Sequence, residues 1–195
     1  MPSSQPQKNM THDEQARFAA LTKEVLARGA FRAQVIDAAA VETDAVFRDI
    51  CAANACGVYG KCWMCPPDIG DIHEMMAELR TYRHVLVYQT VTALEDSYDF
   101  EGMTEAGHAM NRLAQDLRRV VADAGFTDTL HLGAGGCRLC AVCAKRTDEP
   151  CRFPDRAMTS LEAYGIHVSR LAAAAGMKYI NGPDTVTFFG AVFFR

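Results

Sequence analysis

The stretch His84-Val-Leu-Val-Tyr-Gln-Thr-Val-Thr92 carries the clearest strand pattern in this chain. Its β-branched and aromatic residues favour extended backbone on a pleated surface. An amphipathic helix is expected next over 103–124, because Met110, Leu113 and Leu117 recur on one stripe. A further strand is expected over 128–132. The central part of the sequence therefore predicts a strand–helix–strand unit.

The segments on either side of this unit also alternate between helical and extended patterns. Thr11 with Glu14, and Asp71 with Glu74, have the spacing of a capping box at the start of a helix. The further elements expected are strands over 31–37, 177–180 and 185–194, the last two as a hairpin, and helices over 12–28, 44–51, 155–165 and 168–176. We therefore expect an α+β fold: a single domain over residues 11–195 with a mixed or antiparallel sheet, helices packed on one face, and two cysteine-rich metal loops at one end.

Length and charge exclude several classes of protein. A chain of 195 residues has the size of one domain and buries on the order of 70% of its unfolded surface. With 20 Lys and Arg against 24 Asp and Glu, and no basic run, nucleic acid is not expected as a partner. The longest apolar stretch, 171–175, is far shorter than the roughly 20 residues of a membrane span. Residues 1–10 form a polar lead that we expect to be disordered.

The eight cysteines fall into two compact groups of four. Thiolates that converge on a metal come in such local runs, whereas disulfide cysteines are commonly scattered. The lead also lacks an apolar signal core, so a cytoplasmic location with reduced thiols is expected. The candidate metal ligands are Cys51, Cys56, Cys62 and Cys65 in the first group, and Cys137, Cys140, Cys143 and Cys151 in the second.

The spacing within each group indicates the kind of metal. The second group reads Cys137-x2-Cys140-x2-Cys143 before Cys151, which lets one loop wrap three thiolates around an iron–sulfur cluster. Structural zinc instead favours two separated pairs of ligands. Iron–sulfur clusters, expected as two 4Fe–4S clusters, are thus the first interpretation and zinc the alternative. For the first group, the spacing leaves cluster and zinc equally open.

The cysteines stand within a wider set of residues: Cys51, Cys56-Gly57-x-Tyr59-Gly60 and Cys65-Pro66-Pro67, then Gly136-Cys137, Cys140, Cys143, Pro150-Cys151-Arg152-x-Pro154 and Ser160-x-Glu162-Ala163-x-Gly165. This set resembles a family of uncharacterised bacterial and archaeal proteins, described as predicted metal-binding proteins (DUF2284). The resemblance implies metal binding and no settled activity. In that family the position of Cys62 is often not cysteine, which implies that Cys51, Cys56 and Cys65 suffice for the first centre.

The role of Cys62 separates two functions. Without Cys62, a cluster in the first group keeps one iron open to a small molecule, as vacant positions do in catalytic metal sites. With Cys62, both centres are saturated and suit an electron carrier that serves a redox partner protein. The sequence therefore predicts redox chemistry and leaves open whether the protein is an iron–sulfur oxidoreductase. It gives no indication of oligomeric state.

Three residues beside the cysteines are candidates to support a bound cofactor. Arg152 can offset the negative charge of a thiolate cluster, Tyr59 can shield it from water, and Gly136 lets the backbone pass close to it. Two other functions use the same residues: a zinc-stabilised binding module without catalysis, and a protein that delivers a metal or cofactor to a partner. His131 and His167 are the histidines expected nearest the second group.

Overall fold

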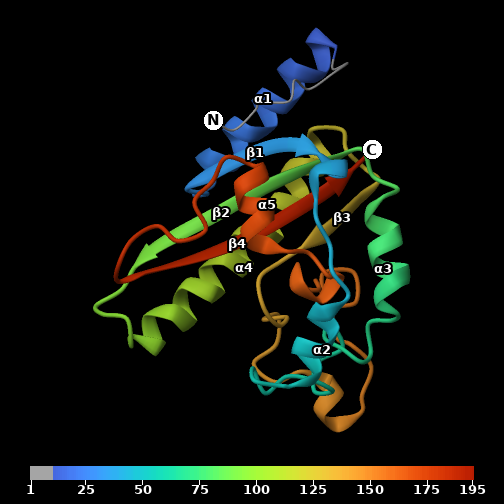
Figure 1. The fold of residues 1–195 in the computed structure, drawn as a ribbon, viewed down its shortest axis with the longest axis vertical. Coiled ribbons are helices and arrows are strands. Elements are labelled where there is room, and N and C mark those ends of the chain that lie inside the picture. Colours follow the sequence, from blue (N-terminus) through green and yellow to red (C-terminus); the bar gives the residue numbers. More distant parts are fainter. Residues whose placement is uncertain (1–10) are drawn as a thin grey trace.

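The computed structural model describes residues 11–195, so the expected disordered lead over residues 1–10 lies outside the described residues. The described chain folds around one antiparallel sheet with strand order β1-β2-β4-β3 (Figure 1). This arrangement confirms the α+β class and selects the antiparallel alternative. The strands are β1 (Arg32–Asp37), β2 (His84–Ala93), β3 (Thr129–Leu132) and β4 (Thr185–Phe194).

The expected strand–helix–strand unit is present in a split form. β2 leads through α4 (Phe100–Asp123) to β3, and both strands pair antiparallel with β4, which lies between them. β2 and β3 consequently run parallel without sharing hydrogen bonds. The last strand of the chain, β4, therefore joins the β1–β2 pair to the edge strand β3.

Helices cover both faces of the sheet, so the expectation of helices on one face is wrong. Successive side chains of a strand point to opposite faces, and β2 sends Leu86 and Tyr88 into one core but Val85 and Val87 into the other. The first core is closed by α1 (His12–Ala27) and α4, and the second by α3 (Ile72–Leu79) and α5 (Val168–Ala174). The continuous apolar run of β2, which lacks strict alternation, is typical of a strand buried on both faces.

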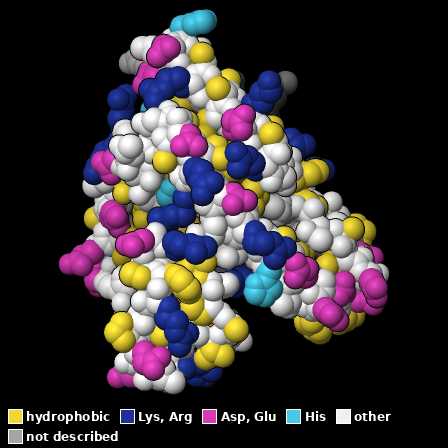
Figure 2. All heavy atoms as spheres, turned by 180° about the vertical axis from the view of Figure 1, so that it is seen from behind, with side chains coloured by type: hydrophobic (Ala, Val, Ile, Leu, Met, Phe, Trp, Pro, Cys, Tyr) yellow, Lys and Arg dark blue, Asp and Glu magenta, His cyan; other side chains and the backbone are white. Residues whose placement is uncertain are grey.

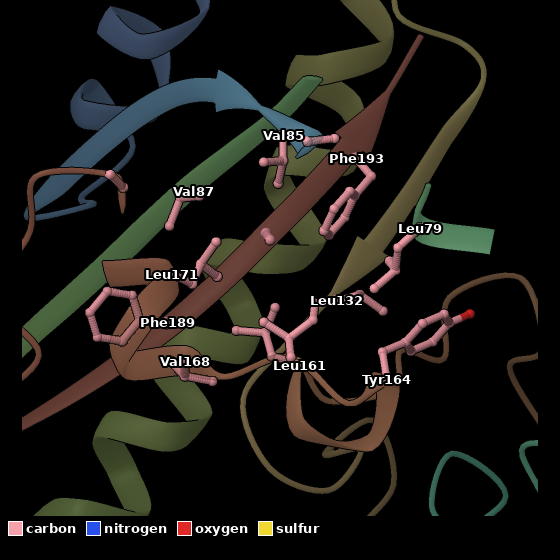
Figure 3. Close-up of a cluster of buried hydrophobic side chains, with 14 of the residues drawn as sticks. Leu79, Val85, Val87, Leu132, Leu161, Tyr164, Val168, Leu171, Phe189 and Phe193 are labelled. Atoms are coloured by element: carbon pink, nitrogen blue, oxygen red, sulfur yellow. The ribbon is translucent and has the colours of Figure 1, made fainter. Parts of the chain in front are cut away.

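Figure 3 shows the core on the α5 side of the sheet. Val87 of β2 and Phe189 of β4 lie around Leu171 of α5, while Leu161 and Tyr164 close the part toward the cysteine loops. The segment that carries Leu161 and Tyr164 follows Cys151 directly in sequence. Packing of this core therefore holds one end of the second cysteine group against the sheet.

The capping signals at Thr11 and Asp71 predicted the starts of α1 and α3 correctly. The Thr11 hydroxyl accepts a hydrogen bond from Glu14 N at 3.2 Å, and Glu14 Oε2 accepts one from Thr11 N at 2.9 Å, which completes the capping box of α1. Asp71 caps α3 by accepting hydrogen bonds from the backbone of His73 and Glu74. Asp99 caps α4 in the same way, so that helix begins at Phe100, before the expected start at 103.

Two expected elements near the C-terminus are wrong. In place of a helix over 155–165, the chain runs beside Gly133. Gly133 N donates a hydrogen bond to Thr159 O at 2.9 Å, and Leu161 N donates one to Gly133 O at 3.1 Å. Only the short 3-10 helix η3 (Glu162–Tyr164) follows. The expected hairpin is also absent from the described residues, because β4 pairs with β2 and β3 and residues 177–180 form no strand.

Cys51 lies near the end of helix α2 (Val46–Ala52), and the other seven cysteines follow in irregular segments at the same end of the molecule. Figure 1 shows α2 and the turns that follow it beside the segment that carries η2 (Ala144–Thr147), away from the sheet. A third short 3-10 helix, η1 (Ala38–Ala40), follows β1. Within residues 11–195, none of the helices has the length and apolar character needed to cross a membrane.

Candidate metal centre

The second cysteine group lies in turns after β3. Gly133 to Gly136 carry the chain from the sheet edge to Cys137, and Cys140 and Cys143 follow in turns that end at η2. Cys151 follows η2 after residues 148–150 and precedes the segment that packs on the sheet. All eight cysteines are free thiols. Seven of them are half-buried or exposed, and Cys62 alone is buried.

A single pocket gathers the second group. Its cavity volume is about 20 Å³, and its wall contains Cys137, Cys140, Cys143 and Cys151. Cys62 lines the same pocket, so five thiols face one space, which we call the thiol pocket. The rest of its wall is mainly apolar and consists of Trp63, Met64, Leu139, Ala144, Arg152 and Phe153.

Cys62 is the buried link between the two cysteine groups. Its side chain is 2% exposed. A hydrogen bond with the Cys65 thiol is the main cause that lowers the pKa of Cys62, helped by backbone amides at Met64 and Cys137 and by the Cys143 thiol. The same hydrogen bond, with burial, raises the pKa of Cys65. The Cys62 thiol therefore touches members of both groups.

Contacts between the two cysteine segments hold them together. Trp63 Nε1 donates a hydrogen bond to Glu149 O at 2.8 Å, and Lys145 Nζ lies 2.9 Å from Asp68 Oδ1. The Lys145 ammonium also sits 4.1 Å from the centre of the Trp63 ring. The two segments, far apart in sequence, thus form one unit.

Cys51, Cys56 and Cys65 form a second cluster of thiols beside the thiol pocket. The pKa of Cys51 is raised mainly by burial and further by the charge of Cys56, while Cys56 and Cys51 both add to the raised pKa of Cys65. Arg48 opposes this effect at Cys51. Its guanidinium is held by Gly70 O at 3.1 Å and by Ala163 O at 3.4 Å.

A family comparison now fits this geometry. Residues 34–194 match the family described as predicted metal-binding protein (DUF2284). The chain belongs to this family. The match includes all eight cysteines and both clusters of thiols. Searches of the curated proteins and of the solved structures give no match.

The donor set of this family member fits a thiolate-bound metal group. Thiolates are the preferred ligands of zinc and of iron–sulfur clusters, and the wall of the thiol pocket offers five of them with few competing oxygens. Within residues 11–195, no three His, Cys, Asp or Glu side chains are arranged to hold a single metal ion. The thiols of each cluster therefore lie near one another without forming a closed coordination sphere.

The three predicted supporting residues take different places. Arg152 lines the thiol pocket, and its guanidinium donates to Val142 O at 3.0 Å and pairs with Glu149. Gly136 lies against the other group, since a Cβ added there would be 3.9 Å from Cys65 Sγ. Tyr59 is half-buried, with its backbone N bonded to Asn54, and it is not part of the pocket wall. The structure brings Arg152 and Gly136 to the cysteines and leaves Tyr59 outside the pocket.

The two histidines stand apart from the thiol pocket. Burial lowers the pKa of His131 to about 4, and its strand position opposite Val192 places it on the α4 side of the sheet. His167 lies just before α5, where its ring packs edge-on against Phe47. Sequence reasoning missed the apolar wall residues Leu139, Ala144 and Phe153. Their position between or just after the cysteines was the available signal.

Proposed function

We propose that this protein binds two iron–sulfur clusters through its cysteines and uses them in redox chemistry. The carrying observation is the thiol pocket, where five cysteine side chains and an apolar wall surround one space. Membership in a family of predicted metal-binding proteins supports metal binding but does not name the metal. The finer assignment rests on the number, spacing and surroundings of the thiols.

The thiol pocket favours a cluster over a single zinc ion. Zinc takes four ligands, typically as two separated pairs, whereas Cys137, Cys140 and Cys143 come from one run and Cys62 and Cys151 add two more thiols. A 4Fe–4S cluster needs four thiolates around a wider body. The apolar side chains of Trp63, Leu139 and Phe153 limit water there, and solvent exposure is one of the factors that set a cluster's reduction potential.

The remaining thiols support a second, more open centre. With Cys62 turned into the thiol pocket, Cys51, Cys56 and Cys65 are left as the neighbouring set. A 4Fe–4S cluster bound by three thiolates offers one iron to a small molecule, which is the chemistry such a group supplies. Arg48 places positive charge beside Cys51 and is fixed by backbone carbonyls, so it orients an anionic group at this position.

This arrangement assigns the two centres different tasks. The thiol pocket has a mainly apolar wall and more thiols than one cluster needs, which suits electron transfer. The set around Cys56 is more exposed and suits contact with a small-molecule substrate or a redox partner protein. Gly136 of the second segment lies against Cys65 of the first, which supports two neighbouring centres.

The test is metal and sulfide analysis of protein purified without oxygen. We expect iron and acid-labile sulfide in near-equal amounts and a broad absorbance at about 400 nm. The double variant Cys140→Ser/Cys143→Ser leaves three thiols in the pocket and should lose about half of the iron. Cys56→Ser should lose the other half. Stoichiometric zinc without sulfide would overturn the proposal and favour a zinc-stabilised binding module.

A further inference from the structure

A second concave site lies on the side of the molecule opposite α5. It forms where the end of α1, the second half of α4 and the segment after Cys151 meet, and its volume is about 240 Å³. Figure 2 shows Lys and Arg side chains gathered across the middle of this face. We call the site the arginine groove; its lining residues are Arg28, Gln115, Asp116, Arg118, Arg119 and Arg156.

The arginine groove carries positive charge that the protein does not neutralise. Asp116 is the one acidic residue in its lining, against four arginines. The ion pairs found within residues 11–195 involve none of these arginines, and residues 1–10 contain no Asp or Glu. In a chain with a net charge of −4, this concentration of like charge attracts anions into the groove.

Hydrogen bonds hold two of the arginines in place. Arg118 Nη2 donates to Asp155 O at 2.7 Å, and Arg156 Nε donates to Gln115 Oε1 at 3.4 Å. Gln115 Nε2 donates in turn to Arg156 O at 3.0 Å. A guanidinium has five N–H donors, so each of these side chains keeps most of its donors for a ligand. The groove is therefore organised in advance of binding.

The composition of the lining points to the class of ligand. Every lining side chain is polar or charged, whereas the centres of protein–protein interfaces are rich in aromatic and apolar anchors. The planar guanidinium matches a phosphate group through paired hydrogen bonds. We propose that the arginine groove binds the phosphate group of a small molecule.

The groove shares a segment of chain with the thiol pocket. The Arg156 guanidinium lies 5.6 Å from the centre of the Phe153 ring, and Phe153 is part of the pocket wall. Only the Phe153 side chain thus separates a phosphate-bearing molecule held by Arg156 from the thiol pocket. Binding in the groove does not itself depend on the metal, so it is tested separately from the proposed function.

The experiment measures pyrophosphate binding to the full chain by calorimetry at physiological salt. The main variant is Arg28→Gln/Arg119→Gln, since neither side chain donates a hydrogen bond to the rest of the described chain and the fold is left intact. We expect at least about tenfold weaker binding, from the loss of two charge-assisted contacts. The matched control is Arg112→Gln on the same helix, where Arg112 pairs with Glu105 outside the groove; its affinity should stay within about twofold.

Alternative ligands provide the outcomes that would overturn the proposal. Saturable binding of pyrophosphate that exceeds binding of citrate and is lost in the double variant supports a phosphate site. Equal binding of citrate would show that the groove binds anions without preference for phosphate, and would overturn the proposal. Polyglutamate that binds more tightly than pyrophosphate, with loss in the same variant, would reassign the groove to an acidic protein partner. No saturable pyrophosphate binding would also overturn the proposal.

Discussion

The Cys62 thiol lies at the boundary between the two cysteine groups. It belongs by sequence to the run that ends at Cys65, with which it shares a hydrogen bond. Its burial and its place in the thiol pocket align it with Cys137 and Cys143 instead. On the proposed function, three thiols of the exposed set and five of the pocket are then available to the two centres.

The surplus of thiols in the pocket predicts tolerance to single substitutions. Cys62→Ser leaves Cys137, Cys140, Cys143 and Cys151 available, so we expect iron and sulfide contents close to those of the wild type. The reduction potential of one cluster should change, because a buried group beside it has been replaced. Cys62→Ser/Cys151→Ser leaves three thiols and should lose the iron of that centre, about half of the total.

Electron paramagnetic resonance of the reduced protein and iron analysis distinguish the outcomes. Cys56→Ser is the matched control, since it removes a thiol that is not part of the pocket wall. If Cys62→Ser loses the same iron as Cys56→Ser, Cys62 is a fourth ligand of the first centre. Both centres would then be saturated, and the protein would be an electron carrier.

Local spacing indicates which cysteines of one segment lie near one another, but not which other segment packs against them. The run from Cys137 to Cys143 lies on one short stretch of chain, so its members share a pocket wherever that stretch packs. Cys62 and Trp63 meet the other segment only through contacts such as that between Trp63 and Glu149. Those contacts join residues far apart in sequence, and no pattern within either segment encodes them.

The elements of the fold differ in how far their own sequence determines them. α1, α3 and α4 start at capping side chains and follow a buried stripe, so local sequence predicts them. β4 takes its central place because β2 and β3 both pair with it. The segment 155–165 has helical spacing, yet the backbone of Thr159 and of Leu161 forms hydrogen bonds with Gly133. Tertiary pairing overrides the local preference there.

The pairing of β2 with β4 depends on the absence of a side chain at Gly190. Gly190 stands opposite Tyr88, and a Cβ added at Gly190 would lie 2.4 Å from Tyr88 Cζ and 2.8 Å from the terminal methyl of Met110. Tyr88 is fully buried and cannot move aside. We expect Gly190→Ala to lower the free energy of unfolding by about 1–3 kcal/mol through overpacking.

Chemical denaturation of Gly190→Ala and wild type measures this loss. Gly133→Ala is the matched control, because an added Cβ there meets no atom within 4 Å; it should stay within about 0.5 kcal/mol of wild type. Equal stability of Gly190→Ala and wild type would show that Tyr88 and Met110 can move enough to accommodate the added methyl group.

At the scale of the whole molecule, the sheet and the cysteine segments are supported in different ways. Two apolar cores, one on each face of the sheet, are formed by the strands and the helices α1, α3, α4 and α5. The cysteine segments instead hold each other through polar contacts such as that between Lys145 and Asp68. The sheet and its helices have their own apolar cores, whereas the cysteine segments rely on the thiols and a few polar contacts.

This division predicts how the protein responds to removal of its metal. Because the two cores need no cysteine ligand, the chelated and reduced chain should keep most of its far-ultraviolet circular dichroism and a cooperative unfolding transition. Hydrogen exchange should accelerate in residues 53–70 and 133–151, while the amides of β2 and β4 stay protected, since the cysteine segments lose the bonds that tie them to one centre. Wild type with its metal retained is the control. A random-coil spectrum after chelation would mean that metal binding supplies the folding free energy of the sheet itself, and the apolar cores would then be insufficient on their own.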